Sequence, residues 1–160
     1  MNSGHNSILD ILKLFDDTPV ESHGTDRHVF RQGMAPTTRT IRGFLLLEGI
    51  AFAVAASVHA GVWIRGYEHG RATVAESVIA AVLLAGLALT WVAPGWTRSA
   101  GVGAQAFALL GTLVGVLTIA VGVGPRTVPD VLYHVAIVAV LAWGLTVARR
   151  APRDAARWHA

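Results

Sequence analysis

The sequence contains no cysteine and only one lysine, and charged residues account for just 14% of its 160 residues. The absence of cysteine excludes disulfides, thiolate metal sites and cysteine-based catalysis. The charged fraction lies well below the roughly 25% of soluble domains, whereas apolar residues make up 53% of the chain and the mean hydropathy is +0.52. The chain also lacks a nucleophile elbow, a P-loop, a dinucleotide fingerprint and an HExxH motif. The sequence therefore indicates a membrane protein and identifies no reaction.

Four long apolar stretches are the main feature of the sequence. They cover residues 43–64, 73–93, 99–123 and 128–148. A hydrocarbon core about 30 Å thick needs about 20 residues of helix, and each stretch meets that length. Short connections force neighbouring helices to be antiparallel. The sequence therefore predicts an all-α membrane protein built as an up-down-up-down bundle of four transmembrane helices, surrounded by a lipid bilayer.

Polar segments flank this predicted domain. Residues 1–42 form a polar N-terminal segment, and residues 149–160 form a basic tail. Within the first segment, residues 7–16 predict a short amphipathic helix, which Ser7 would cap. Its apolar side chains share one face, which suits a membrane surface or a partner protein. A disordered tail with a transient helix is the alternative.

The arginines predict the orientation of the spans. Nine lie beside one set of span ends and three beside the other, and the three are Arg65, Arg71 and Arg126. Because cytoplasmic loops carry the excess of basic residues, this count places both termini in the cytoplasm. No aromatic residues interleave with the arginines, so the pattern does not favour a nucleic-acid surface. The pattern resembles that of small four-span proteins of the bacterial cytoplasmic (inner) membrane.

Titratable residues should gather at one depth inside the outer end of the bundle. Counting along each span at about 1.5 Å per residue places His59, Glu76 and His134 in one layer, with Asp130 slightly above. Ionisable groups are costly in lipid and are functional candidates by default. Each of them has an ordinary structural role as its alternative. Asp130, for example, follows Pro129 and could simply cap the fourth helix.

Three uses of this cluster remain open from the sequence. His59, Glu76, His134 and Asp130 could bind a transition metal ion, since imidazole and carboxylate groups are common ligands. Asp130 could instead orient a metal-bound His134 through a hydrogen bond without binding the metal itself, as carboxylates often do. His59 and His134 could alternatively be the axial ligands of haem b. The third use is a proton relay, because histidine titrates near neutral pH.

A second polar layer lies nearer the cytoplasmic end. Glu48 and Gln105 sit about equally deep in the first and third spans, and Glu48 lies about 16 Å from His59 along the helix. A hydrogen bond between Glu48 and Gln105 would hold two helices together, whereas a protonatable Glu48 could belong to a proton-coupled path. A carboxylate in the first of four spans also resembles the small multidrug transporters. This chain departs from them in its length, its N-terminal segment and the position of Glu48 near the inner boundary.

The third span contains a pair of small residues at helical spacing, Gly111 and Gly115. Such a pair lets two helices approach closely, either within one chain or across a homodimer. The leading hypothesis is therefore a small bacterial membrane protein whose outer cluster binds a metal or haem or relays protons. Its rivals are a non-catalytic accessory subunit of a larger membrane complex and a small proton-coupled transporter that uses Glu48.

Overall fold

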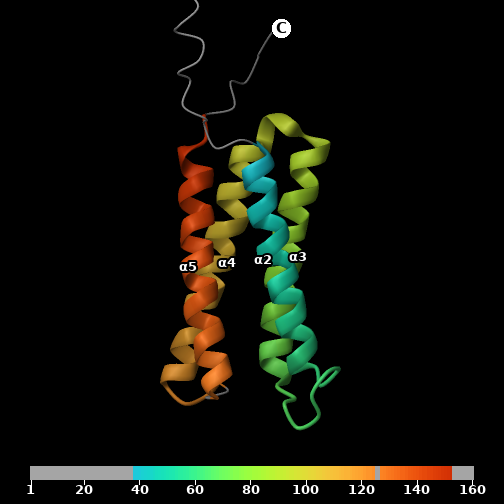
Figure 1. Cartoon of the computed structure of the whole chain (residues 1–160), viewed down its shortest axis with the longest axis vertical. Coiled ribbons are helices and arrows are strands. Elements are labelled where there is room, and N and C mark those ends of the chain that lie inside the picture. Colours follow the sequence, from blue (N-terminus) through green and yellow to red (C-terminus); the bar gives the residue numbers. More distant parts are fainter. Residues whose placement is uncertain (1–37, 125–126, 153–160) are drawn as a thin grey trace, which may run out of the picture. The chain divides into compact units, whose positions relative to one another are not determined.

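Four long helices make up the part of the chain that the computed structural model describes, residues 38–124 and 127–152 (Figure 1). They are α2 (Thr38–His59), α3 (Gly70–Val92), α4 (Thr97–Ala120) and α5 (Val128–Arg150), and a 3₁₀ helix, η2 (Pro94–Trp96), joins α3 to α4. These residues include no strand. All four helices are long and apolar enough to cross a membrane, which indicates a multi-pass membrane protein.

The helix boundaries differ from the predicted stretches mainly in α2. This helix begins at Thr38, in the segment expected to precede the span, and ends at His59, before the predicted boundary at residue 64. After His59 the chain turns through Gly61, whose φ is +75°, a conformation that favours glycine. His59 therefore lies at the end of its helix. The amphipathic helix predicted for residues 7–16 lies outside the described residues.

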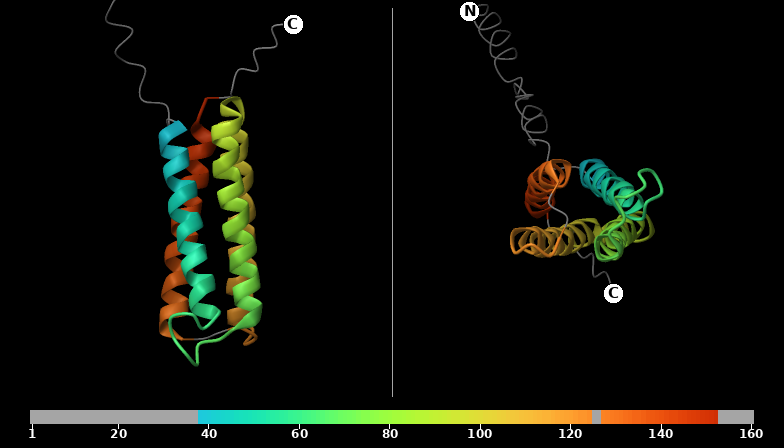
Figure 2. Two further views of the ribbon diagram at one scale, coloured as in Figure 1. Left: turned by 90° about the vertical axis from the view of Figure 1, so that its right-hand side faces the viewer. Right: turned by 90° about the horizontal axis from the view of Figure 1, so that it is seen from below.

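Two arginines fasten helix ends at one end of the bundle. Arg42, near the start of α2, donates to the hydroxyl of Thr90 at 2.9 Å and to its carbonyl at 2.5 Å, near the end of α3. Arg98, near the start of α4, donates to the carbonyl of Ala151 at 3.1 Å, just after α5. In both cases the beginning of one helix lies beside the end of its neighbour, and two views show the helices side by side (Figure 2).

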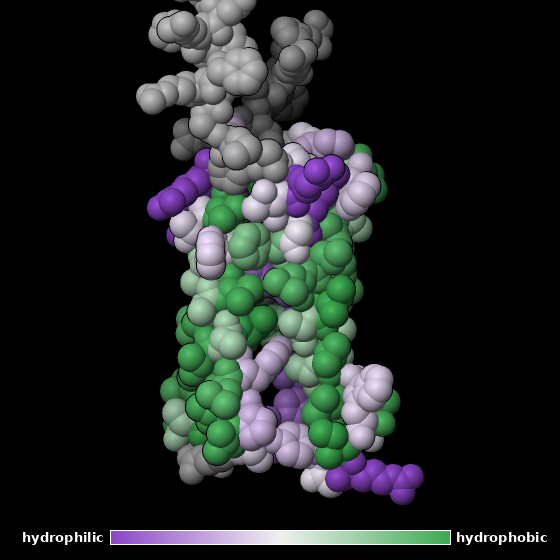
Figure 3. Space-filling model, in the orientation of Figure 1, coloured by the Kyte–Doolittle hydropathy of each residue, from purple (hydrophilic) through white to green (hydrophobic). Residues whose placement is uncertain are grey.

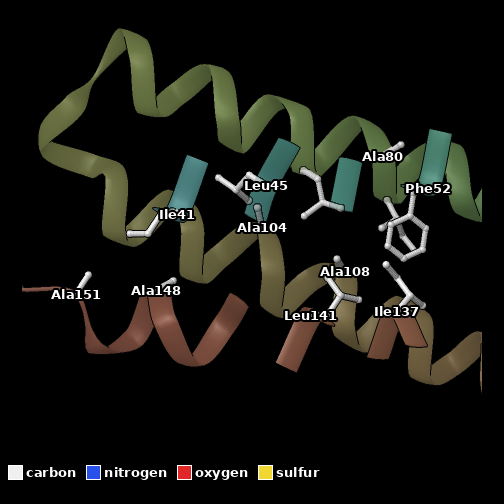
Figure 4. Close-up of a cluster of buried hydrophobic side chains, with 12 residues drawn as sticks. Ile41, Leu45, Phe52, Ala80, Ala104, Ala108, Ile137, Leu141, Ala148 and Ala151 are labelled. Atoms are coloured by element: carbon white, nitrogen blue, oxygen red, sulfur yellow. The ribbon is translucent and has the colours of Figure 1, made fainter. Parts of the chain in front are cut away.

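The apolar core runs along the centre of the bundle (Figure 4). Leu45, Leu83 and Leu141 are fully buried in it, from three different helices. Many large apolar side chains point outward instead and cover the visible face of the helices (Figure 3). An apolar exterior on helices of this length is suited to contact with a lipid bilayer.

The small residues of α4 face the interior of the chain. A Cβ atom added at Gly111 would lie 3.0 Å from Ile79 of α3, and one added at Gly115 would lie 3.5 Å from Nε2 of His134 in α5. Both positions therefore serve close approach within this chain.

Candidate functional site: a buried carboxylate–imidazole–carboxylate triad

Three of the predicted cluster residues meet at the end of the bundle opposite the two arginines. His59 ends α2, Glu76 lies in the second turn of α3, and Asp130 lies in the first turn of α5. Nδ1 of His59 is 2.7 Å from Oε2 of Glu76, and Nε2 of His59 is 3.4 Å from Oδ1 of Asp130. All three residues are buried, with exposed fractions of 4–6%. We call Glu76, His59 and Asp130 the triad.

The helix termini explain why the triad forms. His59 is positioned by the end of α2, where its own carbonyl accepts a hydrogen bond from the amide of His69 at 2.8 Å. Asp130 is held by a capping box, in which Thr127 accepts from the Asp130 amide while the Asp130 side chain accepts from the Thr127 amide. Such reciprocal bonds satisfy amide groups that a helix start leaves unpaired. The capping role expected as an alternative for Asp130 and its place in the triad are therefore both present.

Asp130 receives more hydrogen-bond donors than Glu76. Its Oδ2 accepts from the Tyr67 hydroxyl at 3.2 Å, from the Thr127 amide at 3.2 Å, and from the Thr127 hydroxyl. Tyr67 belongs to the connection between α2 and α3, and its ring stacks on that of His59 at a centroid distance of 6.1 Å. Hydrogen bonds to the charged form favour an ionised carboxylate. This environment therefore favours a negative charge on Asp130.

Proton counting constrains the triad further. Both bonds of His59 are satisfied if the imidazole is a cation between two carboxylates. They are equally satisfied if Glu76 carries a proton and donates it to Nδ1 while the Nε2 proton faces Asp130. The two arrangements hold the same number of protons and both carry a net charge of −1. A proton can therefore move along the 2.7 Å contact between His59 and Glu76 without changing the charge of the buried site.

His134 stands beside the triad and does not complete it. Its Nδ1 lies 2.7 Å from the backbone carbonyl of Asp130. The Asp130 carboxylate, which the sequence suggested could orient a metal-bound His134, faces His59 and the capping residue Thr127. Since a carbonyl can only accept, Nδ1 of His134 is the donor and Nε2 of the neutral ring is an acceptor.

The triad separates two hollows in the protein. A cavity of about 190 Å³ is lined by residues of all four helices, among them Glu76, His59 and His134. A groove of about 280 Å³ between α2 and α5 is lined by His59, Asp130, Tyr67 and Tyr133, among others. Hydrophilic residues line a hollow seen between these two helices (Figure 3). His59 borders both spaces, with Glu76 on one side and Asp130 on the other.

His59, which was predicted to bind a metal ion or haem, has both of its ring nitrogens beside carboxylates. No three histidine, aspartate or glutamate residues within the described ranges are arranged so that they could hold a metal ion. A metal ion or haem iron bound to His59 would have to take the place of the proton that one ring nitrogen shares with a carboxylate.

In the second polar layer Glu48 and Gln105 meet, as expected from their equal depth. Nε2 of Gln105 lies 3.1 and 3.3 Å from the two carboxylate oxygens of Glu48, and both side chains are fully buried. Oε1 of Gln105 has no hydrogen-bond partner among residues 38–124 and 127–152. Between this pair and the triad lie buried apolar side chains, including Phe52 and Ile137. The two polar layers are therefore separated by apolar core.

Sequence reasoning missed two contributors to the site. For Tyr67, nothing in the neighbouring sequence indicates a contact with Asp130. Thr127 could have been found, because Thr127-Val-Pro-Asp130 has the spacing of a capping box.

Comparisons with protein-family models, with curated proteins and with solved structures find no match for this chain.

Proposed function

We propose that this chain is a four-span protein of a bacterial cytoplasmic membrane whose triad takes up and releases protons at the outer face. The observation that carries the proposal is the position of His59, whose two ring nitrogens face carboxylates from two other helices. Buried ionisable groups within membrane helices are commonly parts of proton relays. The triad would serve a proton-coupled function, in which the protonation of Glu76 and His59 changes what the adjacent cavity can bind.

The proposed threading is up-down-up-down with both termini in the cytoplasm. Its support is the excess of arginines beside one set of helix ends, together with the positive-inside rule. In this orientation the triad lies near the outer face. Thr127 is exposed there and contacts Asp130, so a chain of polar groups leads from the surface through Asp130 and His59 to Glu76.

The geometry favours local proton exchange over conduction through the whole bundle. Buried apolar side chains separate the triad from the Glu48–Gln105 pair, and a proton cannot pass groups that neither donate nor accept hydrogen bonds. Glu48 itself is fully buried against an amide donor, an arrangement suited to holding helices together. The observations therefore support the triad, rather than Glu48, as the proton-exchanging site.

The other hypotheses have less support. A metal or haem iron bound to His59 would have to replace a proton that the imidazole shares with a carboxylate. The paired glycines of α4 give an accessory subunit little support, because a Cβ atom added at Gly111 or Gly115 would meet Ile79 or His134 of the same chain. The remaining argument for a partner, the predicted helix at residues 7–16, lies outside the described residues.

Nuclear magnetic resonance of the histidine side chains tests the proposal. The full chain, labelled with nitrogen-15 histidine and placed in lipid nanodiscs, would be titrated with acid and base. We expect the ring nitrogens of His59 to respond to pH although the residue is buried, and Glu76→Gln to alter that response. Glu48→Gln, which changes a buried carboxylate in the other layer, is the matched control and should leave it unchanged. A His59 ring whose protonation stays constant wherever the protein is folded would contradict the proposal.

A further inference from the structure

The two threonines that line the cavity beside the triad can only accept hydrogen bonds from a ligand. The hydroxyl of Thr112 donates to the carbonyl of Ala108, and that of Thr118 donates to the carbonyl of Gly115, both at 2.7 Å. Each hydroxyl has thereby used its only hydrogen and can offer the cavity only lone pairs. Both threonines line the cavity.

The titratable groups inside the cavity have the same character. Nε2 of neutral His134 is an acceptor, because Nδ1 donates to the carbonyl of Asp130. Glu76 uses Oε2 for His59, so its Oε1 remains an acceptor beside the cavity. Both protons of the doubly protonated His59 face carboxylates. These side chains of the described helices therefore offer the cavity several acceptors and no free donor.

The remaining surface of the cavity is largely apolar, with Phe52, Ile79 and Ile119 among its lining residues. Its volume of about 190 Å³ exceeds the roughly 150 Å³ of an engineered protein cavity that binds benzene. One aromatic ring with a short substituent would therefore fit. Ligand sites commonly combine apolar walls with a few polar groups that fix the orientation of the ligand.

Charge decides the class of ligand. The triad carries a net charge of −1 in the state that satisfies both bonds of His59, and Glu76 is the triad carboxylate that lines the cavity. His69 and Arg71 also line the cavity, and they come from the connection after α2 and the first turn of α3. Arg71 is exposed, whereas Glu76 is buried at 6% exposure. A positively charged donor would thus be held best at the buried carboxylate.

We propose that this cavity binds a small lipophilic amine, with its ammonium group donating to Glu76 and His134 and its apolar body against Phe52 and Ile79. Only the pH dependence of amine binding rests on the proposed proton exchange. A further proton on the triad removes its negative charge, so the amine and the proton compete. The affinity for the amine should fall by up to about tenfold for each pH unit in the range where that proton is taken up.

Binding measurements with phenethylamine test the inference. The full chain in nanodiscs would be titrated by calorimetry at neutral pH with phenethylamine and with phenethyl alcohol, which has the same shape and no charge. We expect saturable binding of the amine and at least tenfold weaker binding of the alcohol. Absence of saturable amine binding, or equal affinity for the two compounds, would overturn the proposal.

Two pairs of variants locate the site. Glu76→Gln should weaken amine binding more than tenfold, whereas Glu48→Gln should leave it unchanged. Gly115→Val should block the cavity from α4, whereas Gly103→Val adds the same side chain where nothing lies within 4 Å. The glycine pair tests the location even if Glu76→Gln fails to fold. Amine binding that survives Gly115→Val would overturn the proposal.

The outcomes separate this inference from the proposed function. Amine binding that does not change with pH would leave the cavity site standing and contradict proton exchange by the triad. A His59 ring that titrates in a protein without affinity for phenethylamine would support proton exchange and overturn the amine site.

Discussion

Gly144 of α5 lies directly against the carboxylate of Glu48 in α2. A Cβ atom added at Gly144 would come within 2.6 Å of Oε1 of Glu48 and would also overlap Nε2 of Gln105. The missing side chain at this position therefore makes room for the buried pair. A hydrogen bond between two helices depends here on a residue of a third helix.

Replacing this glycine should destabilise the bundle. We expect Gly144→Ala to lower the free energy of unfolding by about 1–3 kcal/mol, the usual cost of overpacking a core. Gly103→Ala is the control, because a Cβ atom there meets nothing within 4 Å and alanine favours the helix by up to about 1 kcal/mol. Thermal unfolding of the two purified variants checks the difference. Equal stability of Gly144→Ala and the parent chain would show that the pair can move aside.

The Glu48–Gln105 pair should tolerate an amide better than an apolar side chain. In Glu48→Gln the new amide can still accept from Gln105, and it can donate to Oε1 of Gln105, which has no partner. In Glu48→Leu the buried amide of Gln105 loses its acceptor, which should cost about 1–3 kcal/mol. Denaturation of both variants in one detergent measures the contrast. A leucine variant as stable as the glutamine variant would be inconsistent with a structural pair.

Removing the imidazole of the triad should be more damaging at neutral than at acid pH. His59→Ala leaves two buried carboxylates without their shared partner, and breaking a buried ionic contact in this way typically costs about 3–5 kcal/mol. Protonation neutralises the carboxylates, so the loss of stability should shrink as the pH falls. Unfolding curves of the parent and variant chains at several pH values provide the measurement. A loss that is independent of pH would indicate that only packing has changed.

Acid should loosen the connection between α2 and α3. Oε2 of Glu68 accepts from the Gly66 amide at 2.9 Å, and this bond, with a bond from its own amide, lowers the pKa of Glu68. The pKa of Glu68 is therefore lower in the folded chain than in the unfolded chain. The stabilisation from these bonds is present at pH values above the unfolded pKa, and it is lost as the pH falls through the folded pKa. Hydrogen-exchange protection of Gly66 should therefore decrease on acidification. Glu68→Gln should remove this dependence on pH. Protection of Gly66 that varies with pH in the same way in Glu68→Gln and in the parent chain would refute the prediction.

The absence of cysteine allows a direct test of the proposed orientation. A single cysteine introduced as Glu68→Cys should react with a membrane-impermeant reagent applied to the outside of intact cells. One introduced as Gly95→Cys should not react, although Gly95 is exposed and a side chain there meets nothing within 4 Å. Thr97 would be a poor choice for this test because it is buried. The reverse labelling pattern would place both termini outside.

The four helices were predictable because bilayer thickness fixes the length of an apolar stretch. Depth along each span also indicated which polar residues could meet, and the structure joins Glu48 to Gln105 and His59 to Glu76. Depth alone does not determine which way a side chain points around its helix. For that reason the sequence could not show which histidine, His59 or His134, the Asp130 carboxylate faces.

Local backbone detail was harder to predict than the spans. The end of α2 at His59 depends on the turn that follows, and a hydropathy pattern does not reveal it because residues 60–64 are largely apolar. The contact between Tyr67 and Asp130 joins a connection to a helix 63 positions away in the chain. Only the packed bundle brings them together.

The guanidinium groups of Arg42 and Arg98 join the helices in two pairs, α2 with α3 and α4 with α5. At the opposite end the contact between His59 and Glu76 lies within the first pair, whereas the contact between His59 and Asp130 crosses from the first pair to the second. The protonation of His59 therefore acts on a contact that joins the two halves of the bundle.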